Sequence, residues 1–105
     1  MIFITGPLYS GKRTFAQKLG GRQIFDVQNL AADADDLERL ADALAADYDV
    51  AAATEIGGGV VPMEAEQRRA REAAGRLACL LAARADTVIE MFCGIPTVIK
   101  GEMPC

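Results

Sequence analysis

The sequence predicts a three-layer α/β/α domain built on a mostly parallel sheet, with a short antiparallel strand near the C-terminal end. Short apolar runs rich in β-branched residues alternate with segments in which apolar residues recur at helical spacing. The chain is also only 105 residues long, which is the usual size of one domain. We therefore expect residues 1–105 to form a single domain.

The first 27 residues predict a strand, a helix and a second strand. Residues 2–5 are apolar and end at Gly6, which predicts a buried strand that leads into a loop. Residues 11–19 have apolar side chains at helical spacing before two glycines, which predicts a helix. Residues 23–27 form a run too short for a helix and predict the second strand.

The middle of the chain predicts a second helix and a third strand. In residues 33–48 the apolar side chains repeat at helical spacing, and Asp35 and Glu38 resemble a capping box at the start. The alanine content of residues 50–56 favours a helix, but the segment is short and ends at three glycines. We therefore predict a strand for it.

The last part of the chain predicts a long helix and a hairpin. Pro62 is placed as the first residue of a helix that runs to about residue 85. Within it, Gly75 predicts close packing on the sheet, because a mid-helix glycine costs about 1 kcal/mol. Residues 87–93 predict the fourth strand, and residues 97–100 predict a short antiparallel strand that follows a turn.

Composition excludes several classes of function. Histidine is absent, which excludes a histidine-based catalytic triad and a nucleotidyl-histidine intermediate. The three cysteines have no CxxC spacing, which argues against a zinc site or a disulfide framework. No apolar run approaches the roughly 18 residues of a membrane helix, and no secretory leader is recognisable. We expect a cytoplasmic protein with no membrane partner.

Charge is distributed unevenly along the chain. Residues 1–22 contain four basic and no acidic residues, whereas residues 23–63 contain nine acidic residues with Arg39 as their only base. The first segment would attract an anion such as phosphate, and the second would repel a nucleic acid. The arginines of residues 68–76 are interpreted as solvated partners of nearby glutamates rather than as ligand contacts.

Residues 6–12 read G-x-x-x-x-G-K between a predicted strand and a predicted helix, the context of the Walker A phosphate loop. Such a loop points backbone N–H groups at phosphate oxygens, and Lys12 adds a full positive charge. Arg13 stands where a serine or threonine would ligate Mg²⁺, and Thr14 follows about 100° further around the helix. The candidate nucleotide-binding residues are Gly6, Tyr9, Ser10, Gly11, Lys12, Arg13 and Thr14.

Two carboxylates lie at the ends of predicted strands and would be at the edge of the sheet where open α/β folds bind ligands. Asp26 closes the second strand, where a Walker B aspartate holds Mg²⁺ through water. The alternative is that Asp26 is a helix cap or a turn residue. Glu55 closes the third strand and would serve as a base or as a second metal contact. Lys12 and Glu55 are therefore the candidate catalytic residues, and Asp26 is the candidate metal ligand.

Taken together, these segments resemble the adenosylcobinamide kinase/adenosylcobinamide-phosphate guanylyltransferase family of cobalamin biosynthesis. Residues 54–62, Thr-Glu-Ile-Gly-Gly-Gly-Val-Val-Pro, look like that family's Asn-Glu-Val-Gly-x-Gly-Ile-Val-Pro stretch. Residues 68–77 resemble its arginine-rich helix, and residues 85–88 and 94–96 resemble its final strand and hairpin. Residues that fall on its phosphate loop are Gly6, Ser10, Gly11, Lys12 and Ala16, and residues 26–30 match its Walker B segment more loosely.

The resemblance implies a P-loop NTPase-like fold. If the family segment that is missing here includes a strand, the remaining parallel strands should have the order 2-3-1-4. The resemblance also implies ATP or GTP as the nucleotide, Mg²⁺, and a corrinoid (cobinamide) as the acceptor. We expect a homo-oligomer, in keeping with the resemblance, because so short a sheet leaves its edge strands and alanine-rich helix faces poorly covered. The family has a long segment between the first helix and the second strand, and that segment carries the histidine that receives GMP. Only residues 20–23 stand at this place here, so the resemblance implies at most the kinase step.

Two functions stay open at this point. The chain is either a kinase that phosphorylates the cobinamide hydroxyl, or a degenerate subunit that binds nucleotide or anions and acts in assembly or regulation. The preserved stretch from Glu55 to Pro62 favours the kinase. Arg13 and the shortened chain favour the degenerate subunit.

Overall fold

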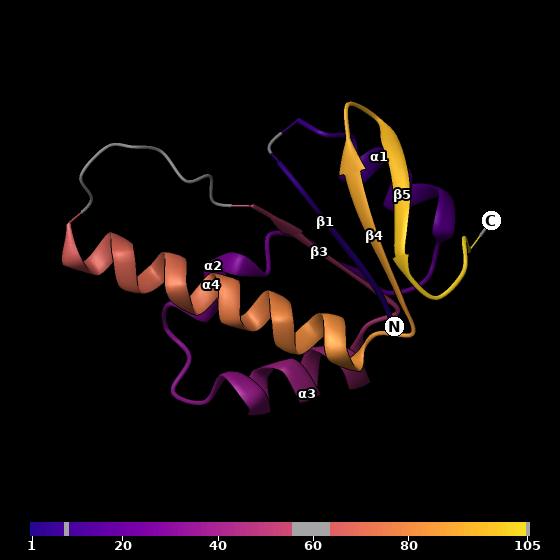
Figure 1. The fold of residues 1–105 in the computed structure, drawn as a ribbon. Helices are drawn as coiled ribbons and strands as arrows, with labels where there is room; N and C mark the ends of the chain where they lie inside the picture. Colours follow the sequence, from indigo (N-terminus) through magenta and orange to yellow (C-terminus); the bar gives the residue numbers. More distant parts are fainter. Residues whose placement is uncertain (8, 56–63, 105) are drawn as a thin grey trace.

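A computed structural model describes residues 1–7, 9–55 and 64–104 of the chain. The elements in this part, shown in Figure 1, are β1 (Ile2–Gly6), α1 (Lys12–Leu19), β2 (Gln23–Ile24), α2 (Gln28–Ala31), α3 (Leu37–Asp47), β3 (Val50–Thr54), α4 (Ala65–Arg84), β4 (Thr87–Phe92) and β5 (Ile95–Lys100). Up to β4 each strand is followed by a helix, as the sequence predicts, except that two helices, α2 and α3, stand between β2 and β3.

The strands form one sheet in the order β2-β3-β1-β4-β5. β1 lies parallel to β3 and to β4, β2 lies parallel to β3, and β5 pairs antiparallel with β4. The expected parallel order 2-3-1-4 is therefore present, with the antiparallel strand added at one edge. This order puts β1 at the centre, so the segments that follow β1 and β3 leave the same carboxyl edge side by side.

Helices cover both faces of the sheet. Phe3 of β1 packs with α2, α3 and α4 on one face, whereas Ile4 packs with Phe15 and Ala16 of α1 on the other. Figure 1 shows α4 with α2 and α3 on one side of the sheet and α1 on the other. Adjacent strand residues point to opposite faces, so two neighbouring apolar side chains in β1 serve two different cores. The three-layer α/β/α fold is confirmed.

The core is built largely from small side chains. Residues 51–53 of β3 are alanines and all are buried, and Leu77 and Leu81 of α4 are at most 1% exposed. Small residues on the central strands let the helices approach the sheet closely. None of the helices in the described ranges is both long and apolar enough to span a bilayer.

Two predicted boundaries in the first half are wrong. β2 has two residues instead of the predicted 23–27, because the backbone turns at Asp26, whose φ is 57°. The short helix α2, which the sequence did not predict, follows that turn. α3 begins at Leu37 rather than at residue 33, and its N-cap is Asp36 instead of Asp35.

The later boundaries shift as well. α4 begins at Ala65 after the N-cap Glu64, which forms a capping box with Gln67, and Pro62 lies outside the described residues. β5 begins two residues earlier than predicted, because the hairpin turn consists of Cys93 and Gly94 alone. Both have positive φ, 50° and 77°, as two-residue hairpin turns require.

The prediction for Gly75 is also wrong. The residue is exposed. A Cβ placed on it would have no heavy atom within 4 Å apart from its chain neighbours and the nearby backbone of its own helix. Close packing on the sheet therefore does not explain this glycine.

Candidate phosphate-binding site

The loop between β1 and α1 is held at both ends by backbone hydrogen bonds from other parts of the sheet. The carbonyl of Gly6 accepts from the N–H of Glu55 at 2.9 Å, and the carbonyl of Ser10 accepts from the N–H of Gly94 at 2.9 Å. The first bond ties the loop to the end of β3, and the second ties it to the β4–β5 turn. The loop is thus part of the carboxyl edge of the sheet.

Its two motif glycines are needed for packing and for backbone conformation. A Cβ on Gly6 would lie 2.4 Å from the carbonyl oxygen of Met91, closer than real Cβ contacts. Gly11 is the N-cap of α1 with φ of 90°, and a Cβ there would lie 3.2 Å from the Cα of Gly94. A side chain at either position would disturb the contact between the loop and the hairpin.

Lys12 is the buried charge of the site. It is 9% exposed, and its Nζ donates hydrogen bonds to the carbonyl of Pro7 at 2.7 Å and to Ser10 Oγ at 3.2 Å. Burial lowers the pKa of Lys12 from its ordinary value, and the negative charges of Asp26 and Glu55 partly oppose this. The ammonium group therefore lies inside the curl of the loop at the N-terminus of α1.

Arg13 and Asp26 form an ion pair at the mouth of the loop. Arg13 Nη2 lies 3.2 Å from Asp26 Oδ2, and the guanidinium stacks on the ring of Phe25, 4.5 Å from its centroid. The two side chains are 65% and 47% exposed, respectively. An ion pair this open to water contributes at most about 1 kcal/mol to stability.

The second carboxylate oxygen of Asp26 is held from the other side. Oδ1 accepts from Thr54 Oγ1 at 3.4 Å and from Gln28 Nε2 at 3.5 Å. Gln28 in turn accepts the N–H of Thr54 on its Oε1 at 3.0 Å. The start of α2 and the end of β3 thereby fix Asp26 next to α1.

A pocket of about 320 Å³ opens beside the loop. Its lining consists of Tyr9, Ser10, Gly11, Lys12, Arg13, Thr14, Phe25, Asp26, Ala52 and Thr54. The structure therefore brings six of the seven candidate nucleotide-binding residues to one cavity together with Asp26. Gly6 contributes through the backbone that shapes the loop.

Glu55 lies at a second, adjacent pocket rather than at the first. This pocket also measures about 320 Å³, and its polar lining comes from Thr5, Gln28, Thr54, Glu55 and Arg71. Thr54 lines both pockets. Glu55 itself is exposed, and its carboxylate is close enough to affect the pKa of Lys12.

The donor set does not fit magnesium as a Walker A site holds it. Such a site takes a hydroxyl from the residue after the lysine and a carboxylate that reaches the metal. Arg13 occupies the hydroxyl position here, and its guanidinium already binds the carboxylate of Asp26. Within the described residues, no three acidic or cysteine side chains are grouped so that they could hold a metal ion.

Sequence reasoning missed four residues of the site. Phe25 and Gln28 lie within two residues of Asp26, and Thr54 directly precedes Glu55. Closeness in the chain to a candidate carboxylate could therefore have predicted these three residues. Arg71 was interpreted as a solvated residue of the long helix, but it lines the second pocket. No periodicity distinguishes it from the neighbouring arginines.

The structure combines a buried strand, a glycine loop that encloses a lysine, and a helix that begins at that lysine. On a sheet of this order, these features are typical of P-loop α/β proteins. A model of the cobinamide kinase/cobinamide phosphate guanyltransferase family matches residues 22–99, which is more than half of the chain. The chain belongs to this family, as the resemblance predicted. The match begins after α1, so the loop itself lies outside it. No curated protein matches the sequence significantly.

Proposed function

We propose that the protein is a cytoplasmic nucleotide-binding protein that holds the triphosphate of ATP or GTP on the loop from Gly6 to Lys12. At most, it transfers the γ-phosphoryl group to the hydroxyl of cobinamide. The observation that carries this proposal is the enclosed ammonium group of Lys12 inside a glycine loop, next to an open pocket. Membership of the cobinamide kinase family supports the choice of acceptor.

The loop supplies the positive charge that a triphosphate needs. Its backbone N–H groups and the N-terminus of α1 favour phosphate oxygens, and Lys12 would neutralise the β- and γ-phosphates. Binding would move Lys12 Nζ from the carbonyl of Pro7 to a phosphate oxygen. Arg13 and Thr14 line the same pocket and would contact the phosphate chain.

The second pocket is the proposed place of the acceptor hydroxyl. In the transfer, the hydroxyl oxygen bonds to the γ-phosphorus, the bond from that phosphorus to the bridging oxygen breaks, and a nucleoside diphosphate leaves. Glu55 would receive the proton of the hydroxyl. A corrin macrocycle is far larger than a pocket of about 320 Å³, so only its hydroxyl-bearing arm would enter.

The guanylyltransferase step is not part of the proposal. In the family that step needs a histidine that receives GMP, and the 105 residues contain no histidine. The proposed reaction is therefore the kinase half alone.

A second candidate function is a non-catalytic subunit that binds nucleotide or anions and acts in assembly or regulation. The observation that favours it is the ion pair between Arg13 and Asp26, which stands where phosphoryl transfer normally uses a metal ion. Binding of phosphate survives this change more easily than transfer does.

Association with a second copy of the chain is also proposed. Phe92, Ile95 and Ile99 lie on the edge hairpin and are 60–64% exposed. Pairing of β5 with a second copy would cover these side chains and the free edge of the sheet. Light scattering is expected to give a multiple of 11.2 kDa, and a monomer at assay concentration would refute this.

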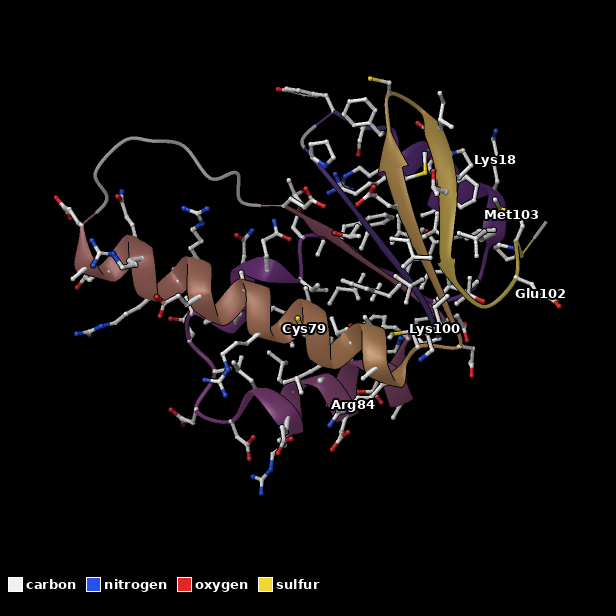
Figure 2. All side chains as sticks on the ribbon, viewed as in Figure 1. Lys18, Cys79, Arg84, Lys100, Glu102 and Met103 are labelled. Carbon is white, nitrogen blue, oxygen red and sulfur yellow. The ribbon has the colours of Figure 1, made fainter. Side chains whose placement is uncertain are left out.

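The test of nucleotide binding is a calorimetric titration of ATP and of GTP. We expect Lys12→Ala to weaken the binding at least roughly 30-fold, because a charge-assisted contact is lost. Lys18→Ala is the matched control, since Lys18 is an exposed lysine near the other end of α1 and points outward (Figure 2). Equal dissociation constants for Lys12→Ala and wild type would disprove the proposal.

The two candidate functions are separated by a transfer assay. Wild type is incubated with cobinamide and nucleotide labelled at the γ-phosphate, with and without Mg²⁺. Labelled cobinamide phosphate supports the kinase, and Glu55→Gln should then lower the turnover number while the nucleotide affinity is unchanged. Binding without any transfer supports the non-catalytic subunit.

A further inference from the structure

We infer that the guanidinium of Arg13 takes the place of the magnesium ion at this phosphate loop, so that the site binds metal-free polyphosphate. The inference rests on the proposed nucleotide binding and specifies the form of the ligand. It makes Arg13 a residue that determines specificity. The geometry of the pair with Asp26 and the lining of the pocket are the observations behind it.

The position of Arg13 is set by α1 and by its two contacts. It follows Lys12 directly and lines the same pocket. Its guanidinium is stacked on Phe25 at 4.5 Å from the ring centroid and held by Asp26 at 3.2 Å. A full positive charge therefore stands where the motif otherwise places a metal ligand.

Both carboxylate oxygens of Asp26 already have partners. Oδ2 accepts from Arg13, and Oδ1 accepts from Thr54 and Gln28. A metal ion bound at Asp26 would have to displace the guanidinium and would then face its positive charge together with that of Lys12. Like charges at such short range disfavour the bound ion.

A guanidinium can do for a polyphosphate part of what a metal ion does. It stays charged at every physiological pH and has five N–H donors in a planar fork that matches phosphate oxygens. Asp26 takes one donor at Nη2, and the Arg13 side chain is 65% exposed. The other donors can therefore reach a phosphate oxygen while the bond to Asp26 is kept.

The charge balance of the pocket points the same way. Among its lining residues Lys12 and Arg13 are positive and Asp26 is negative. A metal-free triphosphate has more negative charge than its magnesium complex, so it gains more from this surplus. The pocket therefore favours the metal-free form.

The test is calorimetry with three probes: ATP, GTP and inorganic tripolyphosphate. Each is titrated once with excess EDTA and once with excess Mg²⁺. We expect wild type to bind at least as tightly in EDTA as in Mg²⁺. Arg13→Ser, which places a hydroxyl after Lys12 and frees Asp26, should bind about tenfold more weakly in EDTA and should regain part of its affinity with Mg²⁺.

Arg22→Ser is the matched control. Arg22 also stacks on an aromatic ring, that of Tyr48 at 5.1 Å, but it does not line the pocket. We expect its affinities to equal those of wild type under both conditions. Asp26→Asn is a second variant, which removes the carboxylate and keeps the guanidinium, and it should keep or raise the affinity in EDTA.

The outcomes distinguish the inference from the function on which it rests. Wild-type binding that is tenfold or more tighter in Mg²⁺ than in EDTA would overturn the inference and leave nucleotide binding intact. Unchanged affinity of Arg13→Ser in EDTA would also overturn it. If none of the three probes binds under either condition, the proposed nucleotide binding itself is wrong.

Discussion

Two arginine–aspartate ion pairs lie on opposite faces of the sheet, and their surroundings differ. On the face with α3 and α4, Arg84 of α4 binds Asp42 of α3 and also donates to the carbonyl of Leu80 at 3.1 Å. Its side chain is 25% exposed, and Figure 2 shows it beside α3, near the C-terminal end of α4. At the loop between β1 and α1, the Arg13 side chain is 65% exposed and borders a pocket.

This difference separates an arginine that links two helices from an arginine that can still donate hydrogen bonds to a ligand. Arg84 joins two helices, and its guanidinium donates to two partners in the protein, Asp42 and the carbonyl of Leu80. Among the described residues, Arg13 donates a hydrogen bond to Asp26 alone, and its guanidinium stacks on the ring of Phe25. Its other N–H donors therefore stay accessible to a ligand. The helix-pair region, α3 and α4, should therefore respond to mutation in stability, and the loop region should respond in binding.

The largest effect is expected in the helix-pair region. Leu81 is fully buried in the core between α4 and the sheet. Leu81→Ala should lower the free energy of unfolding by about 3 kcal/mol, because it leaves a cavity. Urea titration measures this, with Leu81→Met as the control of similar volume. Nucleotide affinity of the folded variant should be unchanged, and a selective loss of binding would erase the contrast between the regions.

Two glycines sharpen the comparison, because one lies in each region. Gly6→Ala should lower stability by about 2 kcal/mol, since its Cβ would collide with the carbonyl of Met91. Gly75→Ala should raise stability by up to about 1 kcal/mol, since that position on α4 is open and alanine is the better helix former. Thermal unfolding of both variants checks the opposite signs. Destabilisation by both would show that α4 needs its glycine.

The two arginines allow a smaller test of the same idea. Arg84→Ala should cost about 1 kcal/mol of stability, because the link between α3 and α4 is lost. Arg13→Ala should cost less than about 0.5 kcal/mol, because its ion pair is exposed to water. Parallel urea titrations give both values. A larger cost at Arg13 than at Arg84 would make the loop pair a structural contact.

The smallest effect is a pH dependence from Lys12. Its pKa in the folded protein lies below 10.5, so the unfolded chain binds more protons as the pH approaches that value. Stability should therefore rise with pH in this window, as the cost of the buried charge disappears. Comparing wild type with Lys12→Met from about pH 8 to 10.5 isolates this contribution. If the stability of wild type relative to Lys12→Met falls as the pH rises, the predicted direction of the effect is wrong.

Several features were determined by the sequence alone. The glycine loop before Lys12 was recognised because its chemistry lies within seven consecutive residues and needs no distant partner. The parallel order of the strands and the family also followed from local stretches and their resemblance. Such features depend on backbone conformation and on residues close together in the chain, which a linear pattern records.

Only the tertiary structure determined which side chains contact one another beside this loop. Asp26 meets Arg13 and Thr54, which are 13 and 28 residues away in the chain. Whether the side chain at position 26 would cap a helix, bind a metal or pair with an arginine depended on a left-handed turn at that residue and on the side-by-side strands β2 and β3. The direction of a side chain after such a turn is set by packing between distant segments, so the linear order of residues does not contain it.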